Sequence, residues 1–335
     1  MSESLLSIKD LRVVYRGDHA PVYAVNGISF DLAQGRTVGL VGETGAGKTT
    51  TALSIMGLLP KKIGFIEGGS IEFDGQNLSE LSKKAYQRIR GNDISMIFQD
   101  PMTSLNPVLQ VGDQIAEALL LHGKATKKDV DEKVGQLMEL VGIPAARRVE
   151  YPHQFSGGMK QRIVIAIALA CEPKLLIADE PTTALDVTIQ AQVLEIIDSL
   201  RREMNMSMLL ITHDLGVVVE CCDDVVIVYA GEVVEQGTVE DIYGEGEHHP
   251  YTVGLFDSIP RLDVKSERLH PIDGLMPDPT DLPEGCCFAP RCSKCQEICR
   301  QQKPVPHVRG SHQIKCHFTP GYEPLETPEG GEDIE

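Results

Sequence analysis

The most informative segment of this chain is Gly42-Glu43-Thr44-Gly45-Ala46-Gly47-Lys48-Thr49. It matches the pattern G-x-x-x-x-G-K-[ST], in which glycines let backbone N–H groups curl around phosphates and the following helix start adds a favourable dipole. Residues 37–41 before it form a short apolar run that predicts a buried strand, and helical sequence begins at about Thr50. Strand, glycine-rich turn and helix are the context that this motif requires. The sequence therefore predicts a phosphate loop, with Lys48 reaching the β and γ phosphates and Thr49 ligating Mg²⁺.

An acidic pair follows another short apolar run further along the chain. Residues 175–178 have the composition of a buried strand, and Asp179 and Glu180 come directly after it. In proteins with a phosphate loop, a carboxylate at the end of a neighbouring strand holds Mg²⁺. We therefore expect Asp179 to bind the ion and Glu180 to polarise the attacking water as general base. Without the phosphate loop, both would equally well be solvated carboxylates at a strand end.

Strand and helix patterns alternate along much of the chain, which is typical of an α/β fold with a parallel sheet. Strands are predicted over residues 5–8, 11–15, 23–32, 37–41, 175–178 and 208–211, and helices over 155–170 and 189–202. Helical patterning between about 100 and 154 interrupts the alternation and predicts a helical subdomain. Aromatic residues make up 5% of the chain, with no Trp, so we expect a mostly aliphatic core.

The composition excludes several classes of protein. With 335 residues, 42% of them hydrophobic, the chain is long enough for one large and one smaller globular domain. The chain has 49 acidic and 31 basic residues, so its net charge is −18. This charge argues against binding to nucleic acid or anionic lipid through a large basic surface. No apolar run has the length of a membrane-spanning helix, and residues 1–10 lack the pattern of a signal peptide. We expect a cytoplasmic protein that reaches a membrane only by binding another protein there.

Between the phosphate loop and the acidic pair lies Phe155-Ser156-Gly157-Gly158-Met159-Lys160-Gln161-Arg162. A serine and two glycines at a helix start offer a hydroxyl and N–H groups to an anion, although an ordinary capped helix has the same pattern. Beside the other two motifs, this segment resembles the signature motif of ATP-binding cassette (ABC) ATPases, usually Leu-Ser-Gly-Gly-Gln. The resemblance covers residues 5–240. Met159 departs from the usual Gln at a position that does not bind phosphate.

The resemblance to ABC ATPases implies roles for single residues. Gln99 resembles the glutamine that senses Mg²⁺ and links two subdomains, and His213 resembles the histidine that contacts the γ-phosphate and orders the attacking water. Asp186 matches a loop that communicates across a dimer, and Tyr15 matches an aromatic residue that stacks on adenine. In the family, the signature motif closes on the γ-phosphate held by the opposite subunit.

The resemblance thus implies a complete set of site residues. Those expected around ATP are Tyr15, Gly42, Glu43, Thr44, Gly45, Ala46, Gly47, Lys48, Thr49, Thr50, Ser156, Gly157, Gly158, Asp179 and Asp186. The expected catalytic residues are Glu180, His213 and Gln99. The expected Mg²⁺ ligands are Thr49, Gln99 and Asp179.

The last third of the chain resembles one particular group within the ABC ATPases. His249-Pro250-Tyr251-Thr252 and Pro283-Glu284-Gly285-Cys286 look like parts of the C-terminal extension of dipeptide and oligopeptide importer ATPases. Residues 99–107 are similar to the same group, in which this segment docks a cytoplasmic helix of a membrane subunit. The resemblance therefore implies an importer of peptides or of a related small solute such as nickel.

Nine cysteines are unevenly distributed, and six of them lie between Cys286 and Cys316. In a reducing compartment, such clustering favours metal binding over disulfides. Four match cysteines of the importer group and are expected to hold a [4Fe–4S] cluster: Cys286, Cys292, Cys299 and Cys316. The alternatives are a Cys₄ zinc site, in which Cys295 could compete as a ligand, and a set of unligated thiols.

The sequence thus predicts three parts. Residues 1–240 form a nucleotide-binding domain with a RecA-like P-loop core, an antiparallel β subdomain and a helical subdomain at about 100–158. Residues 241–319 form a small, irregular, cysteine-rich C-terminal domain, because proline becomes frequent and periodicity fades. Residues 320–335 are rich in Glu, Pro and Gly and predict a disordered acidic tail.

The resemblance implies an ATPase at the cytoplasmic face of a membrane. Its implied partners are a homologous ATPase subunit, with which it sandwiches ATP, two membrane-spanning permease subunits and, indirectly, an extracytoplasmic solute-binding protein. The first alternative is a soluble ABC ATPase that acts on ribosomes or DNA. Such proteins commonly carry tandem cassettes or a coiled-coil insertion, and neither feature is found in this sequence. An electron-transfer module is the second, and it would leave a complete ATPase cassette without a purpose. No nucleic-acid partner is expected.

Overall fold

The computed structural model describes residues 4–17, 20–183, 186–258 and 272–325. The strands are β1 (Ser4–Tyr15), β2 (Val22–Ala33), β3 (Thr37–Val41), β4 (Gly64–Phe73), β5 (Gln76–Asn77), β6 (Ile94–Ile97), β7 (Leu175–Asp179), β8 (Ser207–Thr212), β9 (Asp224–Tyr229), β10 (Glu232–Thr238), β11 (His307–Arg309), β12 (His312–Ile314) and β13 (Glu323–Pro324). The helices are α1 (Lys48–Ile55), α2 (Lys83–Ile89), α3 (Pro101–Ser104), α4 (Val111–Leu121), α5 (Val130–Leu140), α6 (Gly157–Leu169), α7 (Val187–Glu203), α8 (Leu215–Cys221), α9 (Val239–Tyr243), α10 (Pro250–Asp257) and α11 (Glu297–Gln301). Short 3₁₀ turns cover Leu78–Glu80, Ala145–Val149, Pro152–Gln154 and Ala289–Arg291.

A central sheet carries the phosphate loop. Its strand order is β13-β11-β12-β10-β9-β3-β8-β7-β6, and the run from β9 to β6 is parallel. Strands β3, β7 and β8 are buried along their whole length, as expected for Val-, Ile- and Leu-rich strands covered on both faces. The carboxyl ends of parallel neighbours meet at one edge, so Gly42 after β3, Asp179 at the end of β7 and His213 after β8 lie at the same edge. The α/β fold with a parallel sheet is confirmed.

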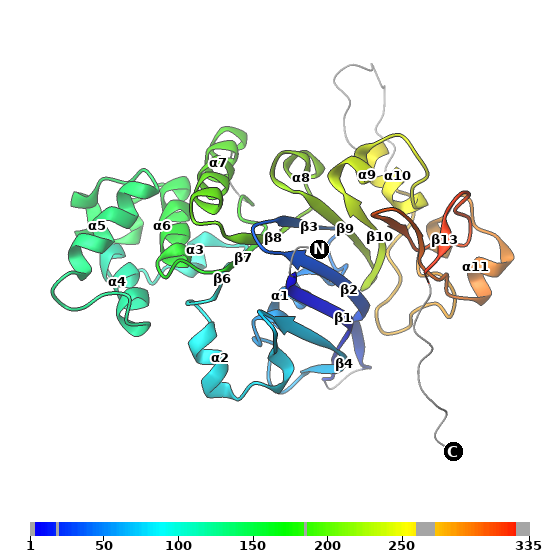
Figure 1. Cartoon of the computed structure of the whole chain (residues 1–335), viewed down its shortest axis with the longest axis horizontal. Coiled ribbons are helices and arrows are strands. Elements are labelled where there is room, and N and C mark those ends of the chain that lie inside the picture. Colours follow the sequence, from blue (N-terminus) through cyan, green and yellow to red (C-terminus); the bar gives the residue numbers. More distant parts are fainter. Residues whose placement is uncertain (1–3, 18–19, 184–185, 259–271, 326–335) are drawn as a thin grey trace.

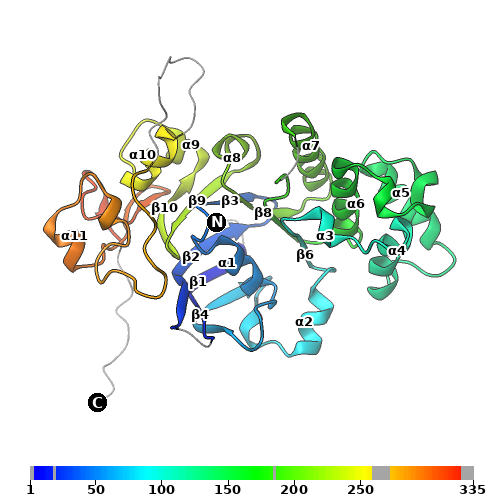
Figure 2. The ribbon, with the colours of Figure 1, turned by 180° about the vertical axis from the view of Figure 1, so that it is seen from behind.

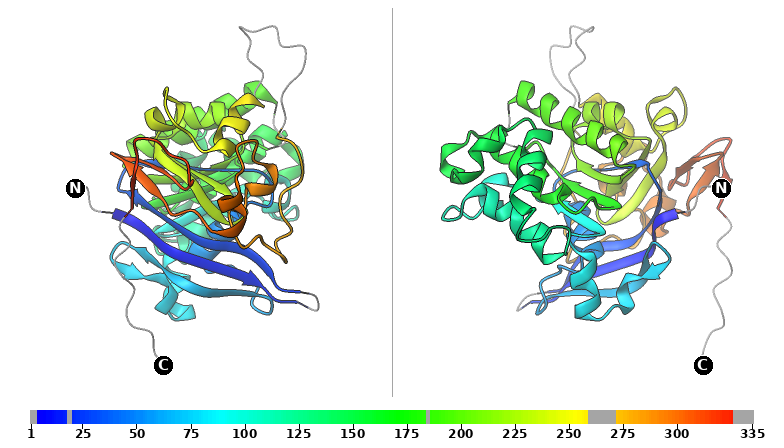
Figure 3. Two further views of the ribbon diagram at one scale, coloured as in Figure 1. Left: turned by 90° about the vertical axis from the view of Figure 1, so that its right-hand side faces the viewer. Right: turned by 60° about the vertical axis from the view of Figure 1, so that its left-hand side comes forward.

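A second, antiparallel sheet has the order β2-β1-β4-β5 and forms a separate layer against the central one (Figure 3). The sequence predicts two strands at residues 5–8 and 11–15, whereas β1 is one strand. A bulge between Ile8 and Leu11, with Asp10 at φ 46°, interrupts the pairing and hides the continuity from a simple alternation pattern. Apolar residues of this sheet share one core with β3 and α1, which brings the end of β1 close to the phosphate loop.

The helices α3 to α6 form a helical lobe (residues 101–169) at one end of the molecule (Figures 1 and 2). The buried residues of α4 include Val111, Ile115 and Leu119, and those of α5 include Val134 and Met138. This spacing of four residues places them on one side of each helix, so both helices are amphipathic and pack onto α6. The sequence predicts these helices to within a residue or two.

The C-terminal elements lie at the opposite end of the molecule (Figure 1). They continue the central sheet, because β12 pairs antiparallel with β10 and β11 with both β12 and β13. The sequence predicts disorder from residue 320, and this is wrong for residues 320–325, where β13 forms and Tyr322 is 8% exposed. The rest of the predicted tail lies outside the described residues. None of the described helices combines the length and the apolar composition needed to cross a membrane.

Candidate active site

The phosphate loop (residues 42–49) connects β3 to α1 and fits tightly between two strands. A Cβ atom at Gly42 would lie 2.2 Å from the carbonyl oxygen of Val228 in β9, and one at Gly47 would lie 2.5 Å from that of Ala24 in β2. Gly47 also has φ 99°, a conformation that other residues rarely adopt. The glycines of the motif are thus required by close backbone contacts as well as by the curl of the loop.

Lys48 is buried inside this loop. Its ammonium group donates to the carbonyl oxygens of Gly42 at 2.6 Å and Glu43 at 3.1 Å. Burial lowers the pKa of Lys48, and the carboxylates of Glu180 and Asp179 oppose that effect. An ammonium group has three donors, so one is left for a phosphate oxygen.

Asp179 ends β7 beside the phosphate loop and is only 2% exposed. Its carboxylate has a hydrogen bond with Thr49, while burial raises its pKa. Among the described residues, its Oδ1 atom has no hydrogen-bond partner. A buried carboxylate oxygen without a donor is costly, and a hard cation such as Mg²⁺ would satisfy it. The pair Asp179 and Thr49 therefore fits the expected Mg²⁺ site.

Glu180 contacts both of the other predicted catalytic residues, Gln99 and His213. Its Oε2 atom accepts hydrogen bonds from Gln99 and Thr183, both at 2.9 Å, and its Oε1 atom lies 3.3 Å from Nδ1 of His213. Burial alone would raise the pKa of Glu180, but the hydrogen bonds from Thr183 and His213 outweigh it, and the pKa is lowered. The carboxylate is therefore ionised at neutral pH, as a general base must be.

The backbone at Glu180 is in a sparsely populated conformation. Its φ is 47°, which a residue with a side chain adopts at a cost of about 1 to 3 kcal/mol. The N–H group of Glu180 donates to the carbonyl oxygen of Ile211 at 2.8 Å, so the link to β8 persists through the turn. Sequence analysis missed Thr183, although its hydroxyl comes three residues after Glu180 in Glu180-Pro181-Thr182-Thr183.

Tyr15, the predicted adenine-stacking residue, ends β1 next to α1. Its hydroxyl lies 3.2 Å from the hydroxyl of Thr50, and its ring is partly exposed. The structure thus places Tyr15 and Thr50 together, beside the start of the helix that follows the phosphate loop.

The signature segment lies elsewhere, at the start of α6 in the helical lobe. Ser156 caps this helix by accepting a hydrogen bond from the N–H of Met159 at 3.4 Å. Ser156 and Gly157 are exposed, whereas a Cβ atom at Gly158 would lie 2.6 Å from a methyl group of Ile189. Asp186 caps α7 in the same way, accepting from the N–H of Ile189 at 3.0 Å. Ala184 and Leu185 lie outside the described residues.

Four cysteines line one cavity of about 30 Å³ in the C-terminal part. They are the four predicted cluster ligands, Cys286, Cys292, Cys299 and Cys316. The sulfur of Cys287 instead donates to the carboxylate of Glu232 at 3.7 Å, and that of Cys295 to the carbonyl oxygen of Gln296 at 3.6 Å. Burial raises the pKa of the Cys286 thiol to about 11, so without a cation it stays protonated.

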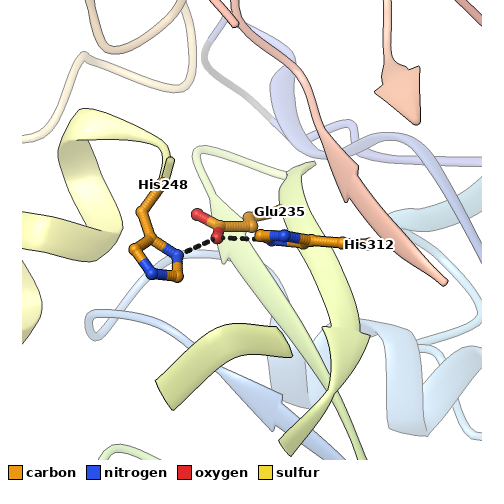
Figure 4. A group of neighbouring side chains, drawn as sticks. All are labelled: Glu235, His248 and His312. Carbon is orange, nitrogen blue, oxygen red and sulfur yellow. Dashed lines mark hydrogen bonds and ion pairs between the residues drawn. The ribbon is translucent and has the colours of Figure 1, made fainter. Parts of the chain in front are cut away.

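One group of three described residues has ligand atoms close enough for a single metal ion: Glu235, His248 and His312 (Figure 4). Hydrogen bonds within the protein already explain why these three side chains lie together. The buried carboxylate of Glu235 accepts from His248 at 2.7 Å, from His312 at 2.8 Å, from the hydroxyl of Thr252 and from the N–H of His249. These bonds lower the pKa of Glu235 to about 2 although burial opposes them. We interpret the group as a polar link between β10, α10 and β12.

Comparisons with known proteins identify the families that this chain resembles. The sequence family described as "ABC transporter" matches residues 25–183, and the family described as "Oligopeptide/dipeptide transporter, C-terminal region" matches residues 234–299. The chain is 52% identical to the dipeptide transport ATP-binding protein DppD of Bacillus subtilis over 94% of each chain. It is 46% identical to the oligopeptide transport ATP-binding protein OppD of Escherichia coli, over 96% of this chain and 92% of that one.

Solved structures support the fold. An ABC transporter cassette, solved as a dimer with ADP and phosphate, superposes with a TM-score of 0.63 at 23% identity, covering 70% of this chain and 98% of the cassette. The cbiO1 protein of Clostridium perfringens, part of an ABC transporter complex, has a TM-score of 0.62 at 26% identity, over 73% of this chain and 92% of its own. Since the relatives match over nearly its whole length, the chain belongs to the family of ABC transporter ATP-binding proteins, in the group of the dipeptide and oligopeptide transport ATPases.

Proposed function

We propose that this protein hydrolyses ATP to power the import of peptides, or of a related small solute such as nickel, through an ABC transporter. The observation that carries the proposal is the arrangement at the carboxyl ends of β7 and β8. There the ionised Glu180 is held by Gln99, Thr183 and His213, next to the unpaired carboxylate oxygen of Asp179. In this assignment Lys48 and the loop N–H groups bind the phosphates, Thr49, Asp179 and Gln99 would hold Mg²⁺, and Glu180 takes a proton from the attacking water.

The exposure of the phosphate loop and of the signature segment favours a site that is shared between two subunits. The phosphate loop presents the exposed Thr44 and Gly45, while the predicted phosphate-binding groups of Ser156 and Gly157 are exposed in the separate helical lobe. A helix N-terminus stabilises an anion brought to it, so the signature of one subunit suits the γ-phosphate on another. We propose that a homologous ATPase subunit is the partner, and that each of two ATP molecules is sandwiched between a phosphate loop and the opposite signature.

A groove of about 400 Å³ between the central sheet and the helical lobe suits the membrane subunits. Its lining includes the large apolar side chains of Leu58, Phe98 and Leu121, which are 38%, 43% and 76% exposed. Exposed apolar side chains gathered in a groove are typical of a site for an amphipathic helix. Phe98 directly precedes Gln99, which contacts Glu180, so a helix seated here would be linked to the general base. We propose that a cytoplasmic helix of a permease subunit binds this groove, at the cytoplasmic face of the membrane.

The variant Leu121→Asp tests this docking site. We expect it to bind ATP normally but to lose most of the co-purification with the membrane subunits, because a charge replaces an apolar contact. Leu140→Asp in α5 is a matched control, since Leu140 is 39% exposed but does not line the groove. Equal co-purification of both variants would contradict the proposal.

For the C-terminal part, about residues 241–319, we propose that the cysteine-rich segment holds a [4Fe–4S] cluster, although its strands continue the central sheet and it shares a core with β9. The support for the cluster is the cavity lined by Cys286, Cys292, Cys299 and Cys316. The sulfurs of Cys287 and Cys295 instead make hydrogen bonds to other groups. Four thiolates are the ligand set that a [4Fe–4S] cluster takes, and a Cys₄ zinc site is the alternative.

Reconstitution tests the proposed function as a whole. The full chain would be assembled in vesicles with the proposed partners, namely two permeases, a homologous ATPase subunit and a solute-binding protein. We expect ATP hydrolysis that rises when the binding protein carries a di- or oligopeptide, together with uptake of that peptide. Uptake of nickel alone would replace the peptide assignment. Hydrolysis stimulated by ribosomes or DNA, and not by the loaded binding protein, would overturn the function.

A further inference from the structure

The C-terminal part of the chain reaches the phosphate loop through one side chain. Arg291 donates from Nη1 to Oε2 of Glu43 at 2.7 Å and from Nη2 to Oε1 at 3.2 Å. The two residues are separated by 248 positions, and Glu43 is the second residue of the loop motif. A two-point bond of this kind fixes both the position and the orientation of a carboxylate.

Arg291 is held rigidly enough to act as an anchor. Its side chain is 5% exposed, and its remaining N–H groups donate to Asp273 O at 3.0 Å, Ile272 O at 3.1 Å and the hydroxyl of Tyr229 at 3.3 Å. All five donors of the guanidinium group are therefore used. A lysine could not reproduce this pattern, because its ammonium group has no fixed fork.

Two further contacts from the C-terminal part reach the same side of the loop. The N–H of Glu43 donates to the hydroxyl of Tyr251 in α10 at 3.0 Å. A Cβ atom at Gly45 would lie 3.0 Å from the terminal methyl group of Met276. The side chain of Glu43, its backbone N–H and the loop apex at Gly45 are thus each in contact with residues that lie beyond position 250.

The elements that bear these contacts are packed together as one unit. The rings of Tyr229, Tyr251 and Phe288 lie with centroids 4.6 to 5.5 Å apart, joining β9 to α10 and to the turn that carries Arg291. The ring cluster therefore ties the residues that contact the phosphate loop to the central sheet.

We propose that Arg291 is a positioning residue for nucleotide binding, which holds Glu43 and thereby keeps the phosphate loop in its binding conformation. Two effects act in the same direction. Without Arg291 the loop gains freedom that ATP binding must then remove, and the carboxylate of Glu43 is left without its counter-ion close to the phosphates. Both effects weaken the binding of ATP and leave the chemical step, at Glu180, unaffected. The inference rests on the proposed function only in naming ATP as the ligand.

The test compares the full-length wild-type chain with Arg291→Met, Glu43→Gln and the double variant, using a fluorescent ATP analogue for affinity and the assembled transporter for kcat and KM. For Arg291→Met we expect KM and the dissociation constant to rise about ten- to hundredfold, as the loss of a charge-assisted hydrogen bond of ordinary strength implies, with kcat nearly unchanged. In the double variant the repulsive charge is gone as well, so we expect affinity to recover at least partly. A merely structural role would not produce that recovery.

Arg201→Met is the matched control. Arg201 is also a largely enclosed arginine, with a side chain that is 11% exposed; it binds one carboxylate, Asp198, through two nitrogens and donates to Gly35 O. We expect it to lower the melting temperature without changing the affinity for ATP. Should Arg291→Met fold poorly, Arg291→Lys provides the same comparison with a smaller effect. Unchanged affinity in folded Arg291 variants, an equal loss in Arg201→Met, or a further loss in the double variant would each overturn the proposal.

The affinity measurement also separates this proposal from the proposed function. If the wild-type chain binds ATP but powers no transport, the proposed function fails, while the difference between Arg291→Met and the wild type still decides the role of Arg291.

Discussion

The side-chain amide of Gln99 donates a hydrogen bond of 2.9 Å to the carboxylate of Glu180, although the two residues are 81 positions apart. Gln99 follows Phe98 of the apolar groove, and Glu180 follows Asp179 at the end of β7. A movement in the groove would therefore reach the proposed general base through a single residue. In the proposed transporter, this contact would connect a permease helix in the groove to the general base.

The first prediction concerns Glu180. In Glu180→Gln, the amide keeps an oxygen for Gln99 but cannot take a proton from water, so hydrolysis should fall by about 10² to 10⁴ while ATP still binds. The closed dimer should accumulate, which size-exclusion chromatography with ATP would detect. Glu172→Gln is the control, because Glu172 is an exposed glutamate that also has a positive φ, of 52°. Near-normal hydrolysis by Glu180→Gln in the assembled transporter would refute the role of this residue.

The second prediction concerns the signature. Ser156→Arg places a large side chain where the partner's γ-phosphate should bind, so the isolated chain should bind ATP normally while hydrolysis by the complex is lost. Removing the helix cap costs about 1 kcal/mol, which the fold should tolerate. Ser82→Arg, at the exposed serine that caps α2, loses a comparable cap and should keep full activity. A loss of ATP affinity in isolated Ser156→Arg as large as in Lys48→Ala would contradict a site shared between subunits.

The third prediction concerns the metal centre. Protein purified without oxygen should be brown, with broad absorbance near about 400 nm and with bound iron and sulfide. A serine at any one of Cys286, Cys292, Cys299 or Cys316 should bleach it, whereas Cys287→Ser and Cys295→Ser should keep the colour. Colourless protein with one equivalent of zinc would replace the cluster by a Cys₄ zinc site. Bleaching by Cys295→Ser would show that the ligands are wrongly assigned.

The fourth prediction concerns acid stability. The folded-state pKa of Glu235 is about 2, below its unfolded value, so its contribution to stability is fully present above about pH 4.5 and is lost as the pH falls toward 2. The shift corresponds to about 3 kcal/mol, and the difference in unfolding free energy between wild type and Glu235→Gln should shrink by that order over this window. Its partner His248 has a raised pKa, so its own contribution is complete below about pH 6.5 and declines above that value.

Denaturant unfolding at a series of pH values measures this difference. Glu240→Gln, at an exposed glutamate in the first turn of α9, is the control and should give no comparable pH dependence. A difference between wild type and Glu235→Gln that is independent of pH between 2 and 5 would refute the assignment of the low pKa.

The sequence alone predicts those features that depend on residues close to one another in the chain. The phosphate loop, the strand before Asp179 and the helices α4 and α5 each have a complete signal within about a dozen residues. The same holds for the cap at Ser156. Their chemistry depends on backbone conformation and periodicity, which neighbouring residues determine.

Contacts between distant segments could not be predicted in this way. Nothing near Arg291 indicates that it binds Glu43, because the contact depends on how α10 and the C-terminal turn pack on β9. The strands β11 and β12 have three residues each, too few for an alternating pattern, and they form because the edge of β10 offers hydrogen bonds. The bulge at Asp10 likewise depends on pairing with β2 and β4.

The continuation of the central sheet beyond β10 has a consequence for synthesis on the ribosome. Glu235 of β10 leaves the ribosome 77 residues before its partner His312, a delay of about 4 to 15 s at a translation rate of about 5 to 20 residues per second. During that time, β10 is an open edge that carries a carboxylate without all of its final partners. This edge of the central sheet is therefore completed only after β12 has been made.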